Sequence, residues 1–281
     1  MTRPPLRILP WLARRLILLA AFLLAAYPLF WMVLTACRTE QDARRHPFAV
    51  IFTPTFANFR EVFASDLFGR AYLNSALVAG GGVILAVAFA ALAAFAFAHC
   101  QFRGKQPLFL LFLVGMMIPI HVTLVPLNLL LGPSALGLKG TLWALVGPYV
   151  GFALPVSILI LRGAFEGVPK ELLEAARMDG CGAWGVFRHV GLPLVRPALA
   201  TVVIFNLLTM WNEFAFALTL LDPRRPTLPL AIAEFQARGE NASELALSCA
   251  ALAVSVLPLL AVYFAAQKHI IRGLTAGAVK E

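Results

Sequence analysis

The chain has 281 residues, of which 60% are hydrophobic and only 13% are charged, and its mean hydropathy is +0.83. Soluble globular proteins are usually about 45–50% apolar and about 25% charged, so the composition excludes an ordinary water-soluble domain and indicates several bilayer-length segments. The net charge of +9 does not indicate nucleic-acid binding, because the basic residues lie between apolar runs and form no single cluster.

Six apolar stretches predict an all-α membrane protein with six transmembrane helices. Each stretch is near or above the roughly 20 residues that cross a hydrocarbon core of about 30 Å. The predicted spans are residues 16–36, 72–98, 107–131, 141–162, 198–221 and 245–266. We divide the chain into an N-terminal segment (1–15), the first span (16–36), an outer loop (37–71), a core (72–266) interrupted by the loop 163–197, and a tail (267–281).

The distribution of Lys and Arg predicts the orientation of these spans. The segments on the side of the two termini hold 14 of these residues, and the opposite segments hold nine. Cytoplasmic loops carry the excess of positive charge in membrane proteins. We therefore expect both termini, and the loop 163–197, in the cytoplasm, and the loop 37–71 outside it.

The loop 163–197 contains a short helix that lies outside the membrane. Pro169 suits the first position of a helix, and Gly180 suits a left-handed C-cap. Apolar and small side chains share one face at helical spacing: Leu172, Ala175 and Ala176. The pattern predicts a docking surface that admits a partner closely, and an amphipathic loop resting on lipid headgroups is the alternative.

The same loop resembles the signature of the permease subunits of ABC importers. In that family Glu-Ala-Ala is followed after three residues by Gly, and after nine more by Ile-x-Leu-Pro. This chain has Glu174-Ala175-Ala176, Gly180 and Val190-Gly191-Leu192-Pro193, with valine in place of isoleucine. Other stretches resemble the carbohydrate-uptake branch, in particular the smaller maltose permease subunit: Tyr72-Leu73-Asn74-Ser75, Pro119, Pro126, Gly137-Leu138, Trp211-Asn212-Glu213-Phe214 and the tail from Arg272 to Lys280.

This resemblance implies a type I ABC importer permease in the inner membrane of a bacterium, carrying a sugar, a polyol or an oligosaccharide. It implies a heterodimer with a second permease, two cytoplasmic ATPase subunits and an extracytoplasmic solute-binding protein. The residues it assigns to ATPase coupling are Glu174, Ala175, Ala176, Asp179, Gly180, Leu192 and Pro193. The residues it assigns to ATPase contact in the tail are Gly273, Leu274, Thr275 and Gly277.

The tail has a second interpretation that needs no ATPase. Its basic residues would rest at the lipid headgroups with no further role. In both interpretations Gly273 and Gly277 are expected to break any helix there.

We expect no enzymatic activity, cofactor or metal in this chain. It has no G-x-x-x-x-G-K-[ST] phosphate loop, no HExxH motif and no GxSxG motif, so ATP and Mg²⁺ would be bound by the partner ATPase subunits. An embedded enzyme would need convergent catalytic groups. The alternatives that stay open are an importer for a non-sugar solute such as glycerol phosphate and an ion-driven secondary transporter, which would not need a cytoplasmic docking helix.

Glu213 is the acidic residue that the prediction places inside a span. A charge in the middle of a membrane costs roughly 2.5–3.5 kcal/mol on insertion scales, so it should face protein or water. We expect Glu213 to line the solute pathway, with Asn212 beside it and Trp211 as a stacking face. An interfacial tryptophan explains Trp211 equally well, and Glu213 could instead pair with the second permease.

Overall fold

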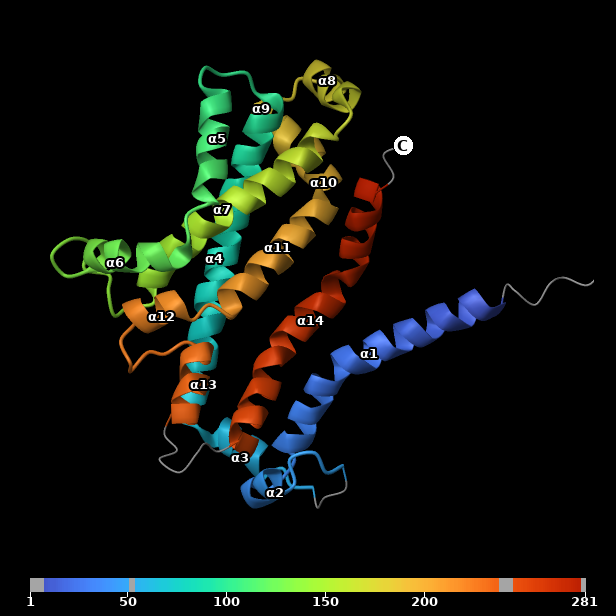
Figure 1. Cartoon of the computed structure of the whole chain (residues 1–281). Helices are drawn as coiled ribbons and strands as arrows, with labels where there is room; N and C mark the ends of the chain where they lie inside the picture. Colours follow the sequence, from blue (N-terminus) through green and yellow to red (C-terminus); the bar gives the residue numbers. More distant parts are fainter. Residues whose placement is uncertain (1–7, 51–53, 238–244, 279–281) are drawn as a thin grey trace, which may run out of the picture. The chain divides into compact units, whose positions relative to one another are not determined.

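The computed structural model describes residues 8–50, 54–237 and 245–278, and these form helices joined by loops (Figure 1). Over the described residues the β-structure is limited to one isolated bridge, between Gly140 and Leu221. Four helices are long and apolar enough to span a membrane, and two bent helix pairs raise the number to six when each pair counts as one span. The predicted all-α membrane fold is confirmed.

The chain divides into two compact units, residues 1–66 with 232–256 and residues 67–231 with 257–281. The helices that contribute to the first unit are α1 (Ile8–Ala36), α2 (Glu40–Arg45), α3 (Ala57–Ala64) and parts of α13 (Leu228–Ala237) and α14 (Leu245–Ala278). Along most of α1 the apolar side chains are exposed on every side of the helix. A helix that is apolar all round meets lipid or another protein chain.

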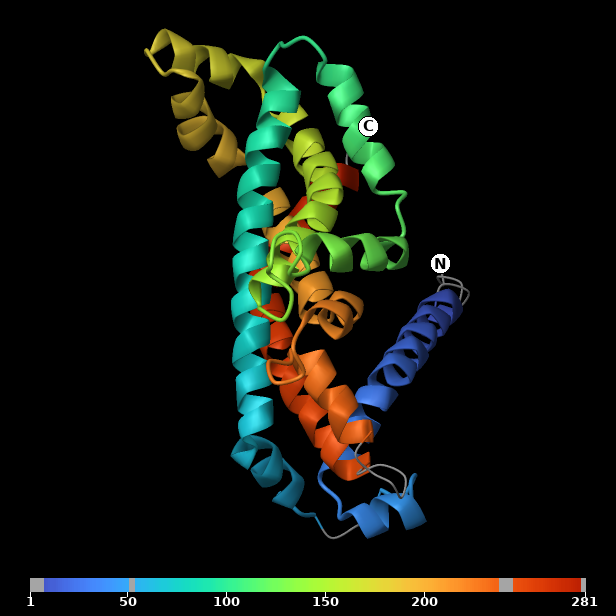
Figure 2. The same ribbon diagram turned by 90° about the vertical axis from the view of Figure 1, so that its left-hand side faces the viewer.

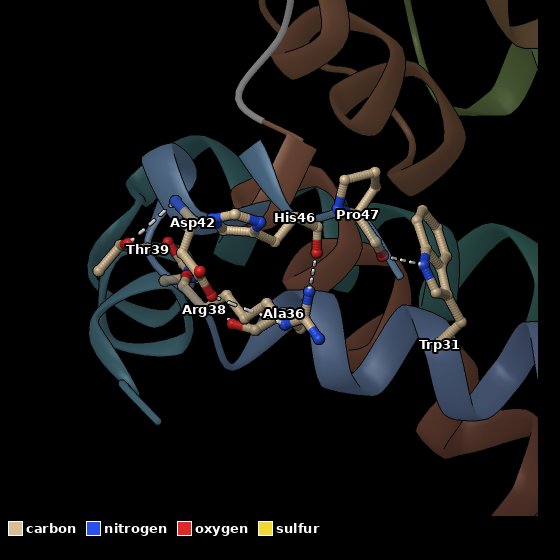
Figure 3. Close-up of polar contacts among 8 residues, drawn as sticks. Trp31, Ala36, Arg38, Thr39, Asp42, His46 and Pro47 are labelled. Carbon is tan, nitrogen blue, oxygen red and sulfur yellow. Dashed lines mark hydrogen bonds and ion pairs between the residues drawn. The ribbon is translucent and has the colours of Figure 1, made fainter. Parts of the chain in front are cut away.

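In the first unit the chain turns after α1 around a buried arginine, Arg38, which is 1% exposed (Figure 3). Its Nη1 donates to the carbonyl of His46 at 2.8 Å, and its Nε lies 3.9 Å from a carboxylate oxygen of Asp42. Asn58 on α3 donates to the carbonyls of Ala36 and Arg38 at 2.8 and 2.7 Å. These bonds satisfy carbonyls that the end of α1 leaves without helical partners.

The first unit also joins two segments that are far apart in the sequence. Glu40 accepts hydrogen bonds from the backbone N–H groups of Leu245 at 3.0 Å and Ala246 at 2.8 Å, the first two residues of α14. Arg44, one turn further along α2, donates to the same carboxylate at 2.7 Å. A carboxylate at the start of a helix satisfies free donors and complements the positive end of the helix dipole.

The second unit is built on α4, α5, α7 and α11, which lie beside one another (Figures 1 and 2). Their bounds are Asp66–His99, Lys105–Gly115, Trp143–Glu166 and Arg196–Trp211. Short helices gather at one end of this group: α8 (Lys170–Met178), α9 (Ala183–Gly185), the π-helix η2 (Val186–Gly191) and α10 (Leu192–Leu194). Away from that end lie α6 (Ile120–Leu131) and α12 (Ala215–Leu220) (Figure 2).

Small residues on α4 allow its neighbours to approach closely. The buried positions of this helix are mostly small: Ala71, Ser75, Ala79, Gly82, Ala86, Ala90, Ala91 and Ala94. A Cβ atom on Gly82 would lie 2.9 Å from Sδ of Met210 and 3.7 Å from Cβ of Tyr149. Because lipid tails are as apolar as side chains, such close van der Waals packing is what holds helices together in a membrane.

Two of the predicted spans are interrupted in the structure. Residues 107–131 form α5 and α6, which are bent by 100° relative to each other. Pro119 explains the bend, because proline has no backbone N–H and disfavours helical geometry in the residue before it. Residues 198–221 form α11 and α12, with the break at residues 212–214. The break at residues 116–119 agrees with the proline in that span, whereas the break after Trp211 departs from the predicted span.

The helices that flank the predicted outer loop are longer than expected. α1 begins at Ile8, and α4 begins at Asp66. The range 37–71 therefore contains α2, α3 and the first turn of α4. Hydropathy does not mark these extensions, because both helices continue past the apolar stretch into polar sequence.

At the other end of the chain, α14 continues through Gly273 and Gly277 to Ala278. The expectation that these glycines break the helix is wrong. A glycine costs only about 1 kcal/mol relative to alanine in a helix interior and keeps its backbone N–H. Four basic residues that contribute to the predicted orientation lie outside the described residues: Arg3, Arg7, Arg238 and Lys280.

Replacing Glu40 with alanine removes the carboxylate that caps α14. Loss of a capping side chain costs about 0.5–2 kcal/mol, so we expect Glu40→Ala to lower the thermal unfolding midpoint of the detergent-solubilised protein by several degrees. The control is Glu61→Ala, at an exposed acid on α3 with no hydrogen bond or ion pair among the described residues. Equal midpoints for the two variants would contradict the capping role.

Candidate functional site

The predicted helix in the loop 163–197 is present as α8, Lys170–Met178, with Pro169 at its N-cap. It ends in a Schellman motif: Gly180 N–H donates to the carbonyl of Arg177 at 3.0 Å, and Cys181 N–H donates to that of Ala176 at 3.0 Å. Gly180 has a φ of +87°, in the left-handed region that only glycine adopts without strain. The predicted left-handed cap at Gly180 is confirmed.

Burial shows which face of α8 is free. Leu173 and Ala176 are buried, and they pack α8 onto the apolar cluster of the second unit. The opposite face consists of exposed residues at helical spacing: Glu171, Glu174, Ala175 and Met178. The predicted docking face is therefore wrong in one member, because Ala176 faces the chain's own core. Its small side chain allows α8 to approach that core and leaves no surface for a partner.

The free face carries a feature that the sequence prediction missed. Met178 is 88% exposed, although large apolar side chains at well-ordered sites are usually covered. Glu174 is exposed beside it and has no ion pair among the described residues. An exposed flexible thioether next to an unpaired acid is typical of a protein-binding surface. The helical spacing Glu171, Glu174, Ala175, Met178 could have revealed this face.

The segment after α8 is fastened to the spans by aromatic rings. Phe187 of η2 is buried, and its ring centroid lies 5.2 Å from that of Phe95 on α4 and 6.3 Å from that of Phe165 on α7. Phe95 and Phe165 meet edge to face at 5.4 Å. Edge-to-face pairs at these distances are favourable beyond the area that they bury. The loop is thus held by two spans and does not lie free on the membrane surface.

The second half of the family pattern, Val190-Gly191-Leu192-Pro193, lies where η2 passes into α10. Leu192 N–H donates to the carbonyl of Phe187, a π-helical bond. A Cβ atom on Gly191 would lie 3.2 Å from the ring of Phe95 and 3.3 Å from that of Phe165. Glycine is therefore the residue that lets η2 rest on these rings.

A hollow of about 280 Å³ opens between α7, α11, α12 and the bend between α5 and α6. Most of its lining is apolar, and it contains a few polar side chains. The lining residues are Gly115, Met116, Ile118, Ile120, Tyr149, Phe152, Ala153, Val156, Phe205, Asn206, Thr209, Met210, Glu213 and Phe216. Both interrupted spans reach this hollow at their breaks.

Glu213 lines the hollow and caps α12 at the same time. Its Oε1 accepts from the N–H of Phe216 at 2.7 Å, and its Oε2 accepts from the N–H of Ala217 at 3.2 Å. The hydroxyl of Tyr149 on α7 donates to Oε2 at 3.1 Å. The carboxylate therefore satisfies backbone donors at the break after α11 and ties α12 to α7. Tyr149, Phe216 and Ala217 all belong to the second unit of this chain.

The other two residues of the predicted pathway do not line the hollow. Trp211 is buried, and its ring meets that of Tyr72 edge on at 5.6 Å. Asn212 is exposed, and its amide donates to the carbonyl of Leu208 at 2.8 Å. The structure brings Glu213 together with Tyr149, Asn206 and Thr209 instead. Sequence reasoning missed all three. Tyr149 is distant from Glu213 along the chain and meets it only because α7 packs nearby. Asn206 and Thr209 lie seven and four residues before Glu213, and this helical spacing could have revealed a shared face.

The remaining predicted site residues have simple positions. Asp179 is the exposed C-cap of α8, and Pro193 is at the start of α10. The tail residues Gly273, Leu274, Thr275 and Gly277 belong to the last turns of α14. In the part of the chain that the structure describes, His, Cys, Asp and Glu form no cluster that could hold a metal ion.

Residues 82–276 match the family described as the binding-protein-dependent transport system inner membrane component. This match runs from within α4 to near the end of α14, and it includes the loop with α8. The chain belongs to this family and is an integral membrane permease.

Relatives with named roles support the same family. The ORF2 protein of Caldicellulosiruptor sp. (strain Rt8B.4), described as an ABC transporter permease, is 41% identical over 92% of this chain and 93% of that protein. The trehalose transport system permease SugB of Mycobacterium tuberculosis is 34% identical over 91% of this chain and 93% of its own. The arabinooligosaccharide permease AraQ of Halalkalibacterium halodurans is 32% identical over the full length of both chains.

A solved structure has the same fold. A chain of a bacterial ABC transporter involved in the import of the acidic polysaccharide alginate has a TM-score of 0.80, covering 96% of this chain and 99% of its own. Its sequence identity is 21%. The likeness establishes the fold of this chain as that of an ABC importer permease.

Gly180 provides a test of the end of α8. A Cβ atom there would meet nothing within 4 Å, so Gly180→Ala is strained only through its backbone, by roughly 1–2 kcal/mol. We expect faster hydrogen exchange at the amides of residues 179–181, and a smaller increase in Gly180→Asn, because asparagine tolerates this conformation better.

The matched control is Gly182→Ala, at a glycine with a φ of −66° and equally open surroundings. Its amides should exchange at the parental rate. A similar increase in Gly182→Ala would show that the left-handed conformation is not the cause.

Proposed function

We propose that this chain is one of two permease subunits of an ATP-driven importer for a sugar, a polyol or an oligosaccharide. The observation that carries the proposal is the connection of α8 to the hollow. The segment with α8 joins the end of α7 to the start of α11, and both of these helices line the hollow. A partner that moves α8 therefore acts on two walls of the same hollow.

The rigidity of this connection supports a coupling role. Leu173 and Ala176 pack α8 onto the core, and Phe187 packs the following turn against Phe95 and Phe165. Well-packed apolar interiors transmit displacement because they have low compressibility. Force applied to the free face, at Glu174 and Met178, would pass to the spans rather than deform the loop.

The proposed coupling role implies several partners for this chain. Two cytoplasmic ATPase subunits would bind ATP and Mg²⁺ and receive α8, and a solute-binding protein would deliver solute from the other side. A second permease would cover apolar surface that this chain exposes, of which α1 is one example. Both termini would lie in the cytoplasm, on the side of α8, in the inner membrane of a bacterium.

The names of the relatives support a carbohydrate as the solute. Trehalose, arabinooligosaccharides and the group melibiose, raffinose and stachyose appear in the names of relatives that are 31–34% identical. Their solutes differ from one another, so we extend only the common class, carbohydrate, to this chain.

The free face of α8 is tested by Met178→Asp and Glu174→Ala. Burying the new charge at position 178 without a partner would cost several kcal/mol in a docked interface. We expect Met178→Asp to prevent co-purification of the ATPase subunits. Glu174→Ala should retain ATP hydrolysis and lower ATP-dependent uptake by about tenfold, because a partly desolvated ion pair is worth roughly 1.4 kcal/mol or more.

The control for both variants is Glu61→Ala, an exposed acid far from α8 in the sequence, which should assemble and transport as the parental protein does. An exposed ion pair is worth only about 0–1 kcal/mol. Near-parental uptake by both Met178→Asp and Glu174→Ala would therefore contradict docking of this face.

The end of α14 is proposed as a second contact with the ATPase subunits, through Gly273, Leu274, Thr275 and Gly277. Truncation before Gly273 keeps the predicted last span intact, so membrane insertion should be unchanged. We expect weaker assembly with the ATPase subunits or unregulated ATP hydrolysis, measured on the purified complex. Parental assembly and hydrolysis after the truncation would favour a tail that rests at the lipid headgroups.

A further inference from the structure

We propose that the hollow between α7, α11 and α12 is a binding subsite, within this chain's own core, for one uncharged, hydroxyl-rich ring of the imported solute. The inference rests on the proposed function, because it concerns a solute that passes through the chain. It goes further in naming where the chain holds that solute and in excluding acidic solutes.

The first argument is the position of the helix breaks. The break between α5 and α6 contributes Met116 and Ile118 to the lining, and the break between α11 and α12 contributes Glu213. Non-helical backbone is tolerated at membrane depth where it is buried in protein or lines a water-filled cavity. Transporters commonly form their solute sites from interrupted helices of this kind. Two breaks that meet at one hollow therefore mark it as a solute site.

The second argument is the chemistry of the polar atoms that line the hollow. Asn206 is fully buried, its amide donates to Oγ of Ser157 at 3.0 Å, and its Oδ1 accepts no hydrogen bond among the described residues. The hydroxyl of Thr209 donates to carbonyls of its own helix, so its oxygen is left to act as an acceptor. The carboxylate of Glu213 is an acceptor as well. A ligand that matches these groups must donate hydrogen bonds, as hydroxyl groups do.

The third argument concerns charge. Among the described residues that line the hollow, none is Lys, Arg or His, and Glu213 is an acid. The backbone donors at the start of α12, which could otherwise attract an anion, are already taken by Glu213. Uronates and sugar phosphates also carry hydroxyl groups, but each adds an anionic group, whose charge the carboxylate of Glu213 repels. The hollow therefore suits an uncharged ring and disfavours glycerol phosphate or an acidic sugar.

The fourth argument is shape. Phe152 and Phe216 pack together at 5.5 Å between ring centroids, and Phe205 is partly exposed on the facing helix. Aromatic faces can cover the apolar C–H surface of a sugar ring while the acceptors take its hydroxyl groups. The volume of about 280 Å³ is at the lower end of the range for small-molecule pockets, about 300–1,000 Å³. One ring fits at a time, as a subsite along a pathway requires.

The test fills the hollow without changing its backbone. Thr209 lies on α11 with its side chain at the hollow, so Thr209→Phe occupies the space that the ring would take. The matched control is Leu208→Phe, at the neighbouring exposed residue of the same helix, which does not line the hollow. Each is produced in the complete transporter and assayed for ATP-dependent uptake.

The probes are radiolabelled trehalose, melibiose and arabinobiose as neutral sugars, and galacturonate and glycerol 3-phosphate as acidic solutes. We expect uptake of at least one neutral probe that depends on this chain, and no such uptake of the acidic probes. Thr209→Phe should lower neutral uptake by about tenfold or more, the loss expected when one ring site is blocked. Leu208→Phe should remain within about twofold of the parental rate.

Three results would overturn the proposal. These are parental neutral uptake by Thr209→Phe, chain-dependent uptake of an acidic probe, and no chain-dependent uptake of any neutral probe. Uptake of an acidic probe with ATP would leave the proposed function standing, since the chain would still be an importer subunit. Loss of function through misassembly is recognised separately, because a misassembled Thr209→Phe variant would not purify with its partner subunits.

Discussion

A polypeptide inside a bilayer must satisfy every backbone donor and acceptor without water, and the second unit is organised around this constraint. Its spans break twice, and each break exposes backbone groups. At the second break the carboxylate of Glu213 accepts the free N–H groups at the start of α12. At the far end of α12 the N–H of Gly140 donates to the carbonyl of Leu220 at 2.7 Å. Because the chain itself satisfies these backbone groups, the helices can stay interrupted and leave the hollow between them.

The same requirement for satisfied backbone groups explains the defined structure of the loop with α8. Its backbone is satisfied locally, by the Schellman motif at Gly180 and the π-helical bond at Leu192. Its position is set by apolar contact, with the ring of Phe187 packed against those of Phe95 and Phe165. Local bonds give the loop its shape, and the rings give it its place on α4 and α7. A shift of α8 is therefore a shift of the spans, and this is the physical content of coupling in a permease of this family.

In the first unit, side chains satisfy backbone groups that are far from them in the sequence. Glu40 caps α14, and Asn58 satisfies carbonyls at the end of α1. Arg38 is buried where these segments meet and is held by the carbonyl of His46 (Figure 3). Charged and amide side chains act here as caps for helices that are otherwise apolar. Their hydrogen bonds determine which helix ends meet. Apolar surfaces that face lipid discriminate little between possible neighbours.

The sequence by itself determined the helical membrane fold, the existence of α8 and the family pattern. These features depend on local quantities: hydropathy over about 20 residues, the fixed φ of Pro169 and the conformational freedom of Gly180. Only the tertiary structure decided that Ala176 faces inward, that the span 198–221 is broken after Trp211, and that Trp211 is buried against Tyr72. Helical spacing shows which residues share a face but not what that face contacts. An apolar stretch has the same hydropathy whether the helix crosses the membrane without a break or bends beside a cavity. The hydrogen bond between Glu213 and Tyr149 depends on how α7 packs beside α11 and α12, which no local pattern encodes.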